Sequence, residues 1–216
     1  MDTALIDYLA RWGHFLAGIT WIGLLYYFTF VQTEYFKEAD GHARTDAISK
    51  LVPRALWWFR WGAMLTFLTG LIMLGIRGAG VTLDITVGAV LGTLMFLNVW
   101  LIIWPNQKIV IASNQQVKAG GEALPAAAGA APKAGLASRT NTLFSIPMLF
   151  FMGSSAHYAH GGLDGNTTAL IVSLVIIAAL EVNAIAGKQG PMTTVKGVIT
   201  CGFGLTAVLW AVVALL

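Results

Sequence analysis

The sequence has little charge and almost no cysteine. Only 11% of its 216 residues are Asp, Glu, Lys or Arg, whereas an ordinary soluble domain carries about 25%. The single cysteine, Cys201, lies in an apolar run, which excludes a disulfide framework, a thiolate zinc site and the CxxCH attachment of a c-type haem. The net charge is only +3 and the basic residues are dispersed, so we expect no nucleic-acid partner.

Apolar segments long enough to cross a membrane fill most of the chain. Hydrophobic residues make up 57% of it, and the lipid bilayer is the natural partner for such a surface. A helix needs roughly 20 mostly apolar residues to cross the hydrocarbon. Segments of about this length lie at 8–31, 55–76, 83–104, 142–160, 167–187 and 196–216. The sequence therefore predicts an all-α integral membrane protein, with about six transmembrane helices in one polytopic domain, residues 1–216.

The lysines and arginines predict which ends of these helices face the cytoplasm. Ten of the 13 basic residues lie in the connections after the first, third and fifth spans. The positive-inside rule makes these connections cytoplasmic, so both termini are expected outside, in the periplasm. This pattern predicts a multi-pass protein of the bacterial inner (cytoplasmic) membrane.

Two of the cytoplasmic connections are long. Residues 32–53 are polar with helical spacing of their apolar residues, so we expect a connector with a short surface helix that Pro53 bends or restarts. Residues 105–140 are expected to form a cytoplasmic loop, because the stretch 119–137 is rich in Ala, Gly and Pro. An extension of the third helix is one interpretation of residues 106–118.

Two histidines are expected at one depth near the outer face. A helix rises about 1.5 Å per residue, which puts His14 and His157 within roughly one or two turns of each other in depth. Arg77, at the outer end of the second span, belongs to the same layer. Small residues and Trp21 continue the face of the first helix below His14.

Two imidazoles at one depth in a helix bundle match the axial ligands of a b-type haem. We predict that His14 and His157 bind the haem iron, with Arg77 or Arg11 near a propionate and Trp21 beside the macrocycle. The alternative is two interfacial histidines bonded to neighbouring helices, with the small residues serving close packing. His160 is either a substitute ligand or an exposed loop residue. The residue pattern assigns no catalytic residue.

A second polar layer is expected on the cytoplasmic side of the membrane. Its members are Arg60, Glu181, Asn98, Asn183 and Ser145. An unpaired carboxylate at that depth is costly, so we predict that Arg60 pairs with Glu181. The layer is then either a structural ion pair or a small cavity for substrate or protons. Arg60 has a further alternative, in which it extends to the cytoplasmic headgroups.

Four stretches resemble the membrane domain of the bacterial membrane-bound urate oxidase family, and they include the unusual combinations WWFRWG and IWPNQK. They are HFLAGITWIGLLYYFTFVQ, LVPRALWWFRWGAMLTFLTGLIMLG, NVWLIIWPNQKIVIAS and SRTNTLFSIPMLFFMGSSAH, and they cover most of residues 10–160. The matching motifs contain His14, Arg60, Asn98, Trp104, Asn106, Arg139, Asn141 and His157. A more distant similarity links the chain to membrane protoporphyrinogen oxidases and copper-resistance membrane proteins, which favours the haem interpretation.

The resemblance implies a membrane domain that carries out or supports oxidation of urate to 5-hydroxyisourate, a step of purine catabolism. Long family members have about eight spans and a cytochrome c domain that carries electrons away. This sequence has no CxxCH and resembles a short form, so electrons would pass to a separate cytochrome c or other redox subunit. The alternative is a non-catalytic membrane subunit or assembly factor of a respiratory or oxidase complex.

Overall fold

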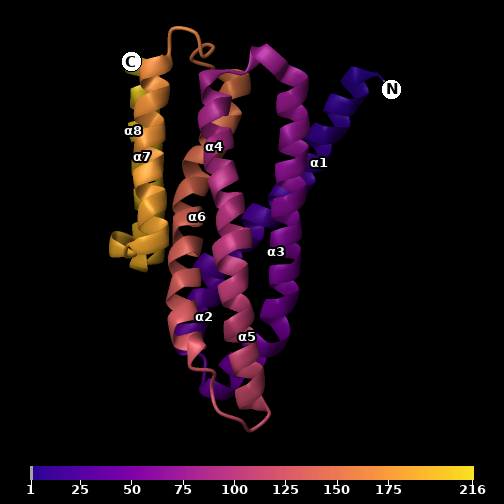
Figure 1. Ribbon diagram of the computed structural model, residues 1–216, viewed down its shortest axis with the longest axis vertical. Coiled ribbons are helices and arrows are strands. Elements are labelled where there is room, and N and C mark those ends of the chain that lie inside the picture. The colour runs from indigo at the N-terminus through magenta and orange to yellow at the C-terminus, as the bar shows by residue number, and fades with distance from the viewer. Residues whose placement is uncertain (1) are drawn as a thin grey trace.

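The computed structural model describes residues 2–216 and consists of six continuous helical rods (Figure 1). The first three rods contain α1 (Thr3–Tyr26), the π-helical η1 (Tyr27–Gln32) and α2 (Thr33–Glu38); α3 (Gly41–Arg77) with the 3-10 turn η2 (Gly78–Gly80); and α4 (Leu83–Leu97), the π-helical η3 (Asn98–Ile103) and α5 (Trp104–Lys118). The others are α6 (Ala126–His157), α7 (Thr167–Ala186) and α8 (Val195–Leu215), with the 3-10 turn η4 (Gly190–Thr193) before α8. The predicted all-α bundle is confirmed.

Five of the six rods are long and apolar enough to cross a membrane, and α6 is the exception. Large apolar side chains are exposed on the outer surface of the bundle, as contact with lipid requires. Phe15, Ile19 and Leu101 are 66%, 71% and 68% exposed. The chain is a multi-pass membrane protein.

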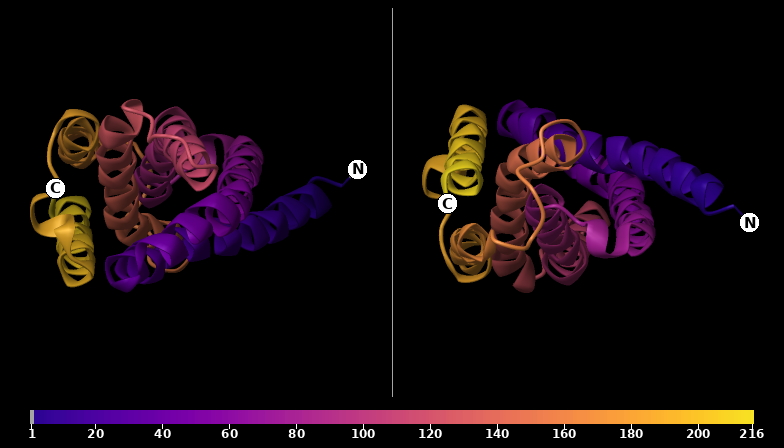
Figure 2. Two further views of the ribbon diagram at one scale, coloured as in Figure 1. Left: turned by 90° about the horizontal axis from the view of Figure 1, so that it is seen from below. Right: turned by 90° about the horizontal axis from the view of Figure 1, so that it is seen from above.

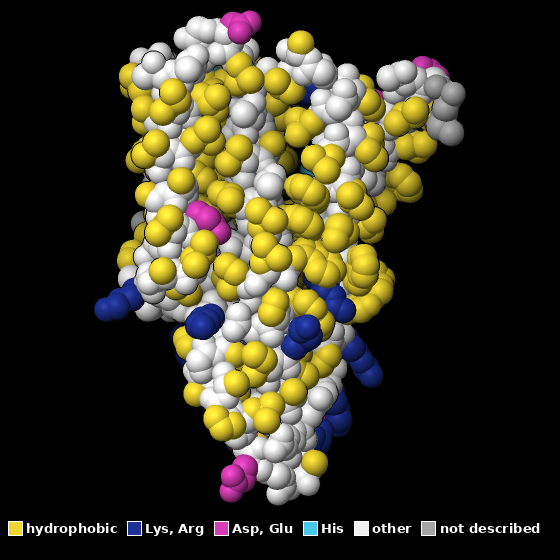
Figure 3. Space-filling view, in the orientation of Figure 1, with side chains coloured by type: hydrophobic (Ala, Val, Ile, Leu, Met, Phe, Trp, Pro, Cys, Tyr) yellow, Lys and Arg dark blue, Asp and Glu magenta, His cyan; other side chains and the backbone are white. Residues whose placement is uncertain are grey.

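Both termini lie at one end of the bundle, which we call the outer end, following the predicted topology (Figure 1). Most of the Lys and Arg side chains visible in Figure 3 lie toward the opposite end, which we call the inner end. Between them the visible surface is largely apolar (Figure 3). The bundle thus has the charge distribution that the sequence indicates, and the membrane side of each end remains a prediction.

The helix α6 lies at the centre of the bundle and contacts α4, α5, α7 and α8 (Figure 2). From Leu136 to Ser155 most of its side chains are buried, as expected for a helix that neighbours surround. Glycines permit this close packing. A Cβ added at Gly202 of α8 would clash with Ile146 Cδ1, and one at Gly88 of α4 would lie 3.3 Å from the Met152 nitrogen.

The helices α1 and α3 form the most extensive of the helix pairs and cross closely at Gly62. A Cβ at Gly62 would lie 3.2 Å from the Trp21 backbone nitrogen and 3.3 Å from the Ala17 carbonyl oxygen. The small residues on this face of α1 therefore serve close helix packing, which is one of the two interpretations open from the sequence.

The connections at the inner end are shorter and more helical than we expected. No separate surface helix occupies residues 32–53: the first rod ends at Glu38, and α3 begins at Gly41 and runs through Pro53. Asp40 caps α3 by accepting a hydrogen bond from the Ala43 nitrogen at 2.8 Å. Packing explains the difference, because Ile48 and Val52 are buried in the core rather than lying on a membrane surface.

The expected loop 105–140 is mostly helical. The α5 helix continues to Lys118, as one interpretation of residues 106–118 allows, and α6 begins at Ala126. Alanine is the strongest helix former, so an Ala-rich segment folds as helix once it has a surface to pack on. Ala130, Ala134 and Ala137 supply that packing, because all three are buried.

Candidate functional sites at the two ends of the bundle

A fully buried carboxylate organises the outer end. Asp84, in the first turn of α4, accepts hydrogen bonds from Ser154 Oγ at 2.6 Å and from the His160 backbone nitrogen at 2.8 Å. It also lies 2.9 Å from His160 Nδ1. The side chain of His160 is therefore fixed through one ring nitrogen. Its other ring nitrogen, Nε2, is buried and has no hydrogen-bond partner among residues 2–216.

His14 of α1 is held in a similar way by α3. Its Nδ1 lies 3.1 Å from Thr69 Oγ1. The Thr69 hydroxyl is within donor reach of the carbonyl oxygens of Leu65 at 2.6 Å and Thr66 at 3.0 Å, so it has no proton to offer the ring. We assign the proton of His14 to Nδ1 on this network, which leaves Nε2 with a free lone pair. Gly70 makes room for the ring, because a Cβ there would lie 3.4 Å from His14 Cε1.

An apolar groove of about 410 Å³ separates α3 from α4 at the outer end. Its walls include Leu74 from α3, and Ala89, Val90 and Leu94 from α4. Figure 3 shows a hollow between these two helices in the upper half of the molecule. Its lining residues lie mainly on α4, and neither His14 nor His160 is among them. The two histidines contact the helices beside the groove, His14 through Thr69 of α3 and His160 through Asp84 of α4.

The other residues expected in the outer layer have different surroundings. His157 lies at the end of α6 with an exposed side chain and makes no side-chain hydrogen bond within residues 2–216. Arg77 ends α3, close in sequence to the groove residue Leu74, and it forms no ion pair with any described carboxylate. Trp21 is 2% exposed and lies in the α1–α3 crossing, where its Nε1 has no described partner.

Two residues of the expected second layer do meet, Asn98 at the start of η3 and Glu181 of α7. The Asn98 side-chain nitrogen donates to Asn141 Oδ1 at 3.0 Å and to Glu181 Oε2 at 3.1 Å. Ser145 is fully buried and bonds the Tyr26 hydroxyl at 2.9 Å. Asn183 does not join this layer, because its side chain bonds the backbone of Lys188 at the end of α7.

The predicted ion pair between Arg60 and Glu181 is wrong. The Arg60 guanidinium lies 3.6 Å from the centroid of the Trp104 ring, a cation–π contact, and no carboxylate in residues 2–216 lies within ion-pair distance of it. Arg60 contacts Trp104 at the start of α5, whereas Glu181 of α7 bonds Asn98, which lies six positions earlier on the same rod.

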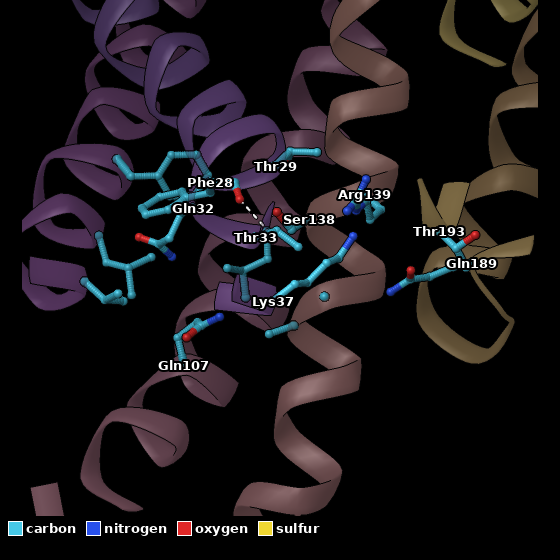
Figure 4. A pocket seen from close by; sticks show the side chains of 16 residues that line it. Phe28, Thr29, Gln32, Thr33, Lys37, Gln107, Ser138, Arg139, Gln189 and Thr193 are labelled. Atoms are coloured by element: carbon cyan, nitrogen blue, oxygen red, sulfur yellow. Dashed lines mark hydrogen bonds between the residues drawn. The ribbon is translucent and has the colours of Figure 1, made fainter. Parts of the chain in front are cut away.

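A second cavity, of about 230 Å³, lies at the inner end among η1, α2, α3, α5, α6 and η4. Polar side chains from five of these segments line it, as Figure 4 shows: Gln32, Lys37, Gln107, Ser138, Arg139, Thr193, and Gln189 just before η4. We call it the inner cavity. Arg139 is only 6% exposed, yet its Nη1 is buried without a hydrogen-bond partner among residues 2–216, and so is Gln32 Oε1.

Sequence reasoning missed the inner cavity, although one signal in the sequence pointed to it. Arg139 opens a polar run, Arg139 to Thr142, inside an otherwise apolar helix. The π-helical turn η1 supplies Phe28, Thr29 and Gln32 to the lining, and π-helical turns occur frequently at functional sites. A π turn is not visible in a hydropathy pattern.

A comparison with protein families agrees with the resemblance. The family model described as "Urate oxidase N-terminal" matches residues 79–214, which is more than half of the chain. The chain belongs to the urate oxidase N-terminal family. No curated protein and no solved structure matches it. The region matched to the urate oxidase N-terminal domain contains Asp84, Arg139 and His160, and it begins after His14 and Arg60.

Proposed function

We propose that this urate oxidase N-terminal domain is a membrane oxidoreductase of the urate oxidase type that binds a b-type haem at the outer end and passes electrons to a separate acceptor. One observation carries the proposal: a buried histidine nitrogen, His160 Nε2, lacks a partner while the opposite ring nitrogen is held by a buried carboxylate. Histidines that ligate metals characteristically have this arrangement, because the carboxylate fixes the tautomer and raises the basicity of the ligating nitrogen.

The outer end supplies the two nitrogen donors that this proposal requires. His14 and His160 each bond a side chain through Nδ1 and keep Nε2 free. The groove between the helices that hold them is lined mainly by apolar side chains, which suit a flat macrocycle. Arg77 forms no ion pair with a described carboxylate, so its guanidinium is available for a propionate. In residues 2–216 no three His, Cys, Asp or Glu side chains gather in a cluster suited to a metal ion, and a bis-histidine haem requires only two protein ligands.

His160 suits the ligand position better than His157 does. The sequence favours His157 only because it lies in the apolar span. His157 is exposed and no described side chain orients it, so binding iron would cost the ordering of a free side chain. His160 is already ordered by Asp84 and by the backbone contact at its own nitrogen. The ligand pair that we propose is therefore His14 and His160, with His157 as the competing candidate.

A haem held by His14 and His160 would supply one-electron redox chemistry of the kind used in electron transfer. The chain's own residues bind and orient the group. The carboxylate of Asp84 stabilises positive charge in its vicinity, and the apolar groove walls exclude water. In this proposal the electrons leave the haem for an acceptor outside residues 1–216, which contain no CxxCH motif.

The optical spectrum of the purified full chain tests the proposal. We expect a Soret band, a positive haem stain and a low-spin reduced-minus-oxidised spectrum that His14→Ala removes. His42→Ala is the matched control, since His42 is exposed at the inner end of α3 and should leave the spectrum unchanged. No Soret band, even after reconstitution with haem, would overturn the proposal. Co-purification with large redox subunits and no cofactor would instead favour the non-catalytic subunit.

A further inference from the structure

The inner cavity has two positive charges and no negative charge in its lining. Lys37 and Arg139 line it, and none of the residues around it is an Asp or a Glu. Figure 4 shows both side chains directing their nitrogen ends toward the same space. Glu34, one turn before Lys37, binds the Lys37 Nζ through both carboxylate oxygens at 2.8 Å. The same carboxylate lies near enough to attract the Arg139 charge, but Arg139 forms no ion pair or hydrogen bond of its own with the described residues.

Burial makes the unpartnered Arg139 guanidinium informative. Arg139 is 6% exposed and makes no hydrogen bond or ion pair within residues 2–216. Burying a charged group without a partner is expensive, and natural structures retain such a group mainly where it serves a function. The planar guanidinium offers a fork of donors that matches an anionic edge with two acceptors.

Side-chain amide groups around the same cavity can form hydrogen bonds with the uncharged edge of a bound molecule. Gln32 Oε1 is buried with no described partner. Gln107 and Gln189 also line the cavity, and neither side chain bonds another described residue. Gln189 is positioned against α6, since a Cβ at Gly135 would lie 3.5 Å from its Nε2. A glutamine presents one acceptor and two donors, which complement a ring that carries adjacent N–H and C=O groups.

The remaining walls suit a flat molecule. Phe28 and Phe59 pack edge to face with ring centroids 5.4 Å apart, and Leu56 lies beside them in the lining. The volume of about 230 Å³ is smaller than that of drug-sized pockets, which is about 300–1,000 Å³. A single small ring system fits these dimensions, and a nucleotide or a haem does not.

We propose that the inner cavity binds a flat organic anion whose edge carries adjacent N–H and C=O groups. Arg139 pairs with the charge, the glutamines bond the amide edge and the aromatic wall contacts the ring face. The location of the site is inferred from the buried Arg139 guanidinium, which has no hydrogen-bond partner among the described residues. The choice of urate as the member of this class to test rests on the proposed function.

The test measures thermal stabilisation and binding by the detergent-solubilised full chain. The probes are urate and its tetramethylated analogue, which keeps the shape but has no N–H group and cannot ionise. We expect urate to raise the unfolding temperature and the analogue to have no effect. Arg139→Gln should weaken urate binding roughly tenfold to a hundredfold, as expected for loss of a charged hydrogen-bond partner, and Gln32→Leu should weaken it less. Arg139→Lys, which keeps the charge but not the fork, should fall between wild type and Arg139→Gln.

The matched control is Arg54→Gln, which removes the same charge from an exposed position outside the cavity and should bind as wild type. Equal urate binding by wild type and Arg139→Gln, or equal stabilisation by the methylated analogue, would overturn the inference. The haem spectrum recorded on the same samples separates the two proposals. Haem without Arg139-dependent urate binding removes the cavity site alone, and urate binding without haem removes the haem assignment alone.

Discussion

The outer and inner ends of this bundle both contain buried polar atoms without hydrogen-bond partners, but the charged side chains around those atoms have opposite signs. At the outer end the unpartnered atom is a histidine nitrogen, and the nearby buried charge is the carboxylate of Asp84. At the inner end it belongs to Arg139, in a cavity lined by two cations and no carboxylate. The first arrangement favours a metal-centred group and the second favours an anion. A single family domain therefore offers two chemically distinct sites at opposite ends.

Removing Asp84 gives the largest expected effect on this comparison. Asp84→Ala deletes the acceptor of three hydrogen bonds in a fully buried position and leaves their donors unpaired. We expect the free energy of unfolding to fall by about 3–5 kcal/mol, measured by chemical unfolding in mixed micelles. Asp164→Ala, at an exposed position of the same outer end, should have little effect. If the two variants behave alike, Asp84 does not organise the outer end.

Replacing Arg139 should change the free energy of unfolding in the opposite direction. Arg139→Met removes a buried charge that has no described partner and keeps an apolar side chain of similar length. Without ligand, the free energy of unfolding should rise by about 1–3 kcal/mol, measured in the same unfolding experiment. A clear loss of stability would mean that the guanidinium is already compensated, and the contrast between the two ends would disappear.

The α1–α3 crossing lies between the two ends, and Gly62 is the residue at which the two helices approach most tightly. Gly62→Ala places a Cβ 3.2 Å from the Trp21 backbone nitrogen, so overpacking should lower stability by about 1–3 kcal/mol. In Gly23→Ala, the new Cβ meets nothing within 4 Å, and stability should not fall. Thermal unfolding of both variants measures the difference. Equal midpoints would show that the crossing tolerates a methyl group.

The smallest expected change comes from Thr69, which holds His14. Thr69→Val keeps the shape but removes the acceptor for His14 Nδ1. The free energy of unfolding should fall by only about 0.5–1.5 kcal/mol, while the reduced-minus-oxidised spectrum should weaken because the ring loses its fixed orientation. Thr86→Val, which removes a hydroxyl from the groove wall that does not contact His14, is the comparison variant. Identical spectra for the two variants would argue against this role of Thr69.

Hydropathy alone predicted the six rods, because apolar length is a local property of the chain. Hydropathy did not predict the inner ends of α3 and α6. Buried packing of Ile48 extends α3, and that of Ala130 and Ala134 extends α6. Depth estimates placed Asn98 and Glu181 together correctly. They misassigned the partner of Arg60, because depth does not give the direction in which a side chain faces.

The contacts that define the two sites join residues far apart in the sequence. Asp84 and His160 are separated by 76 positions, and from the sequence Asp84 is only the boundary of a span and His160 a possible loop residue. The lining of the inner cavity comes from the first rod, α3, α5, α6 and η4. No periodicity within one segment carries that information, so it emerges only when the helices pack.

The central claim is that His160, fixed by Asp84, ligates a haem together with His14. The most direct measurement compares reduced-minus-oxidised spectra of purified His160→Ala and His157→Ala, prepared side by side with equal haem supply. The account predicts loss of the low-spin signal in His160→Ala and an unchanged signal in His157→Ala. An unchanged spectrum in His160→Ala with loss in His157→Ala would contradict it and identify the exposed histidine as the ligand.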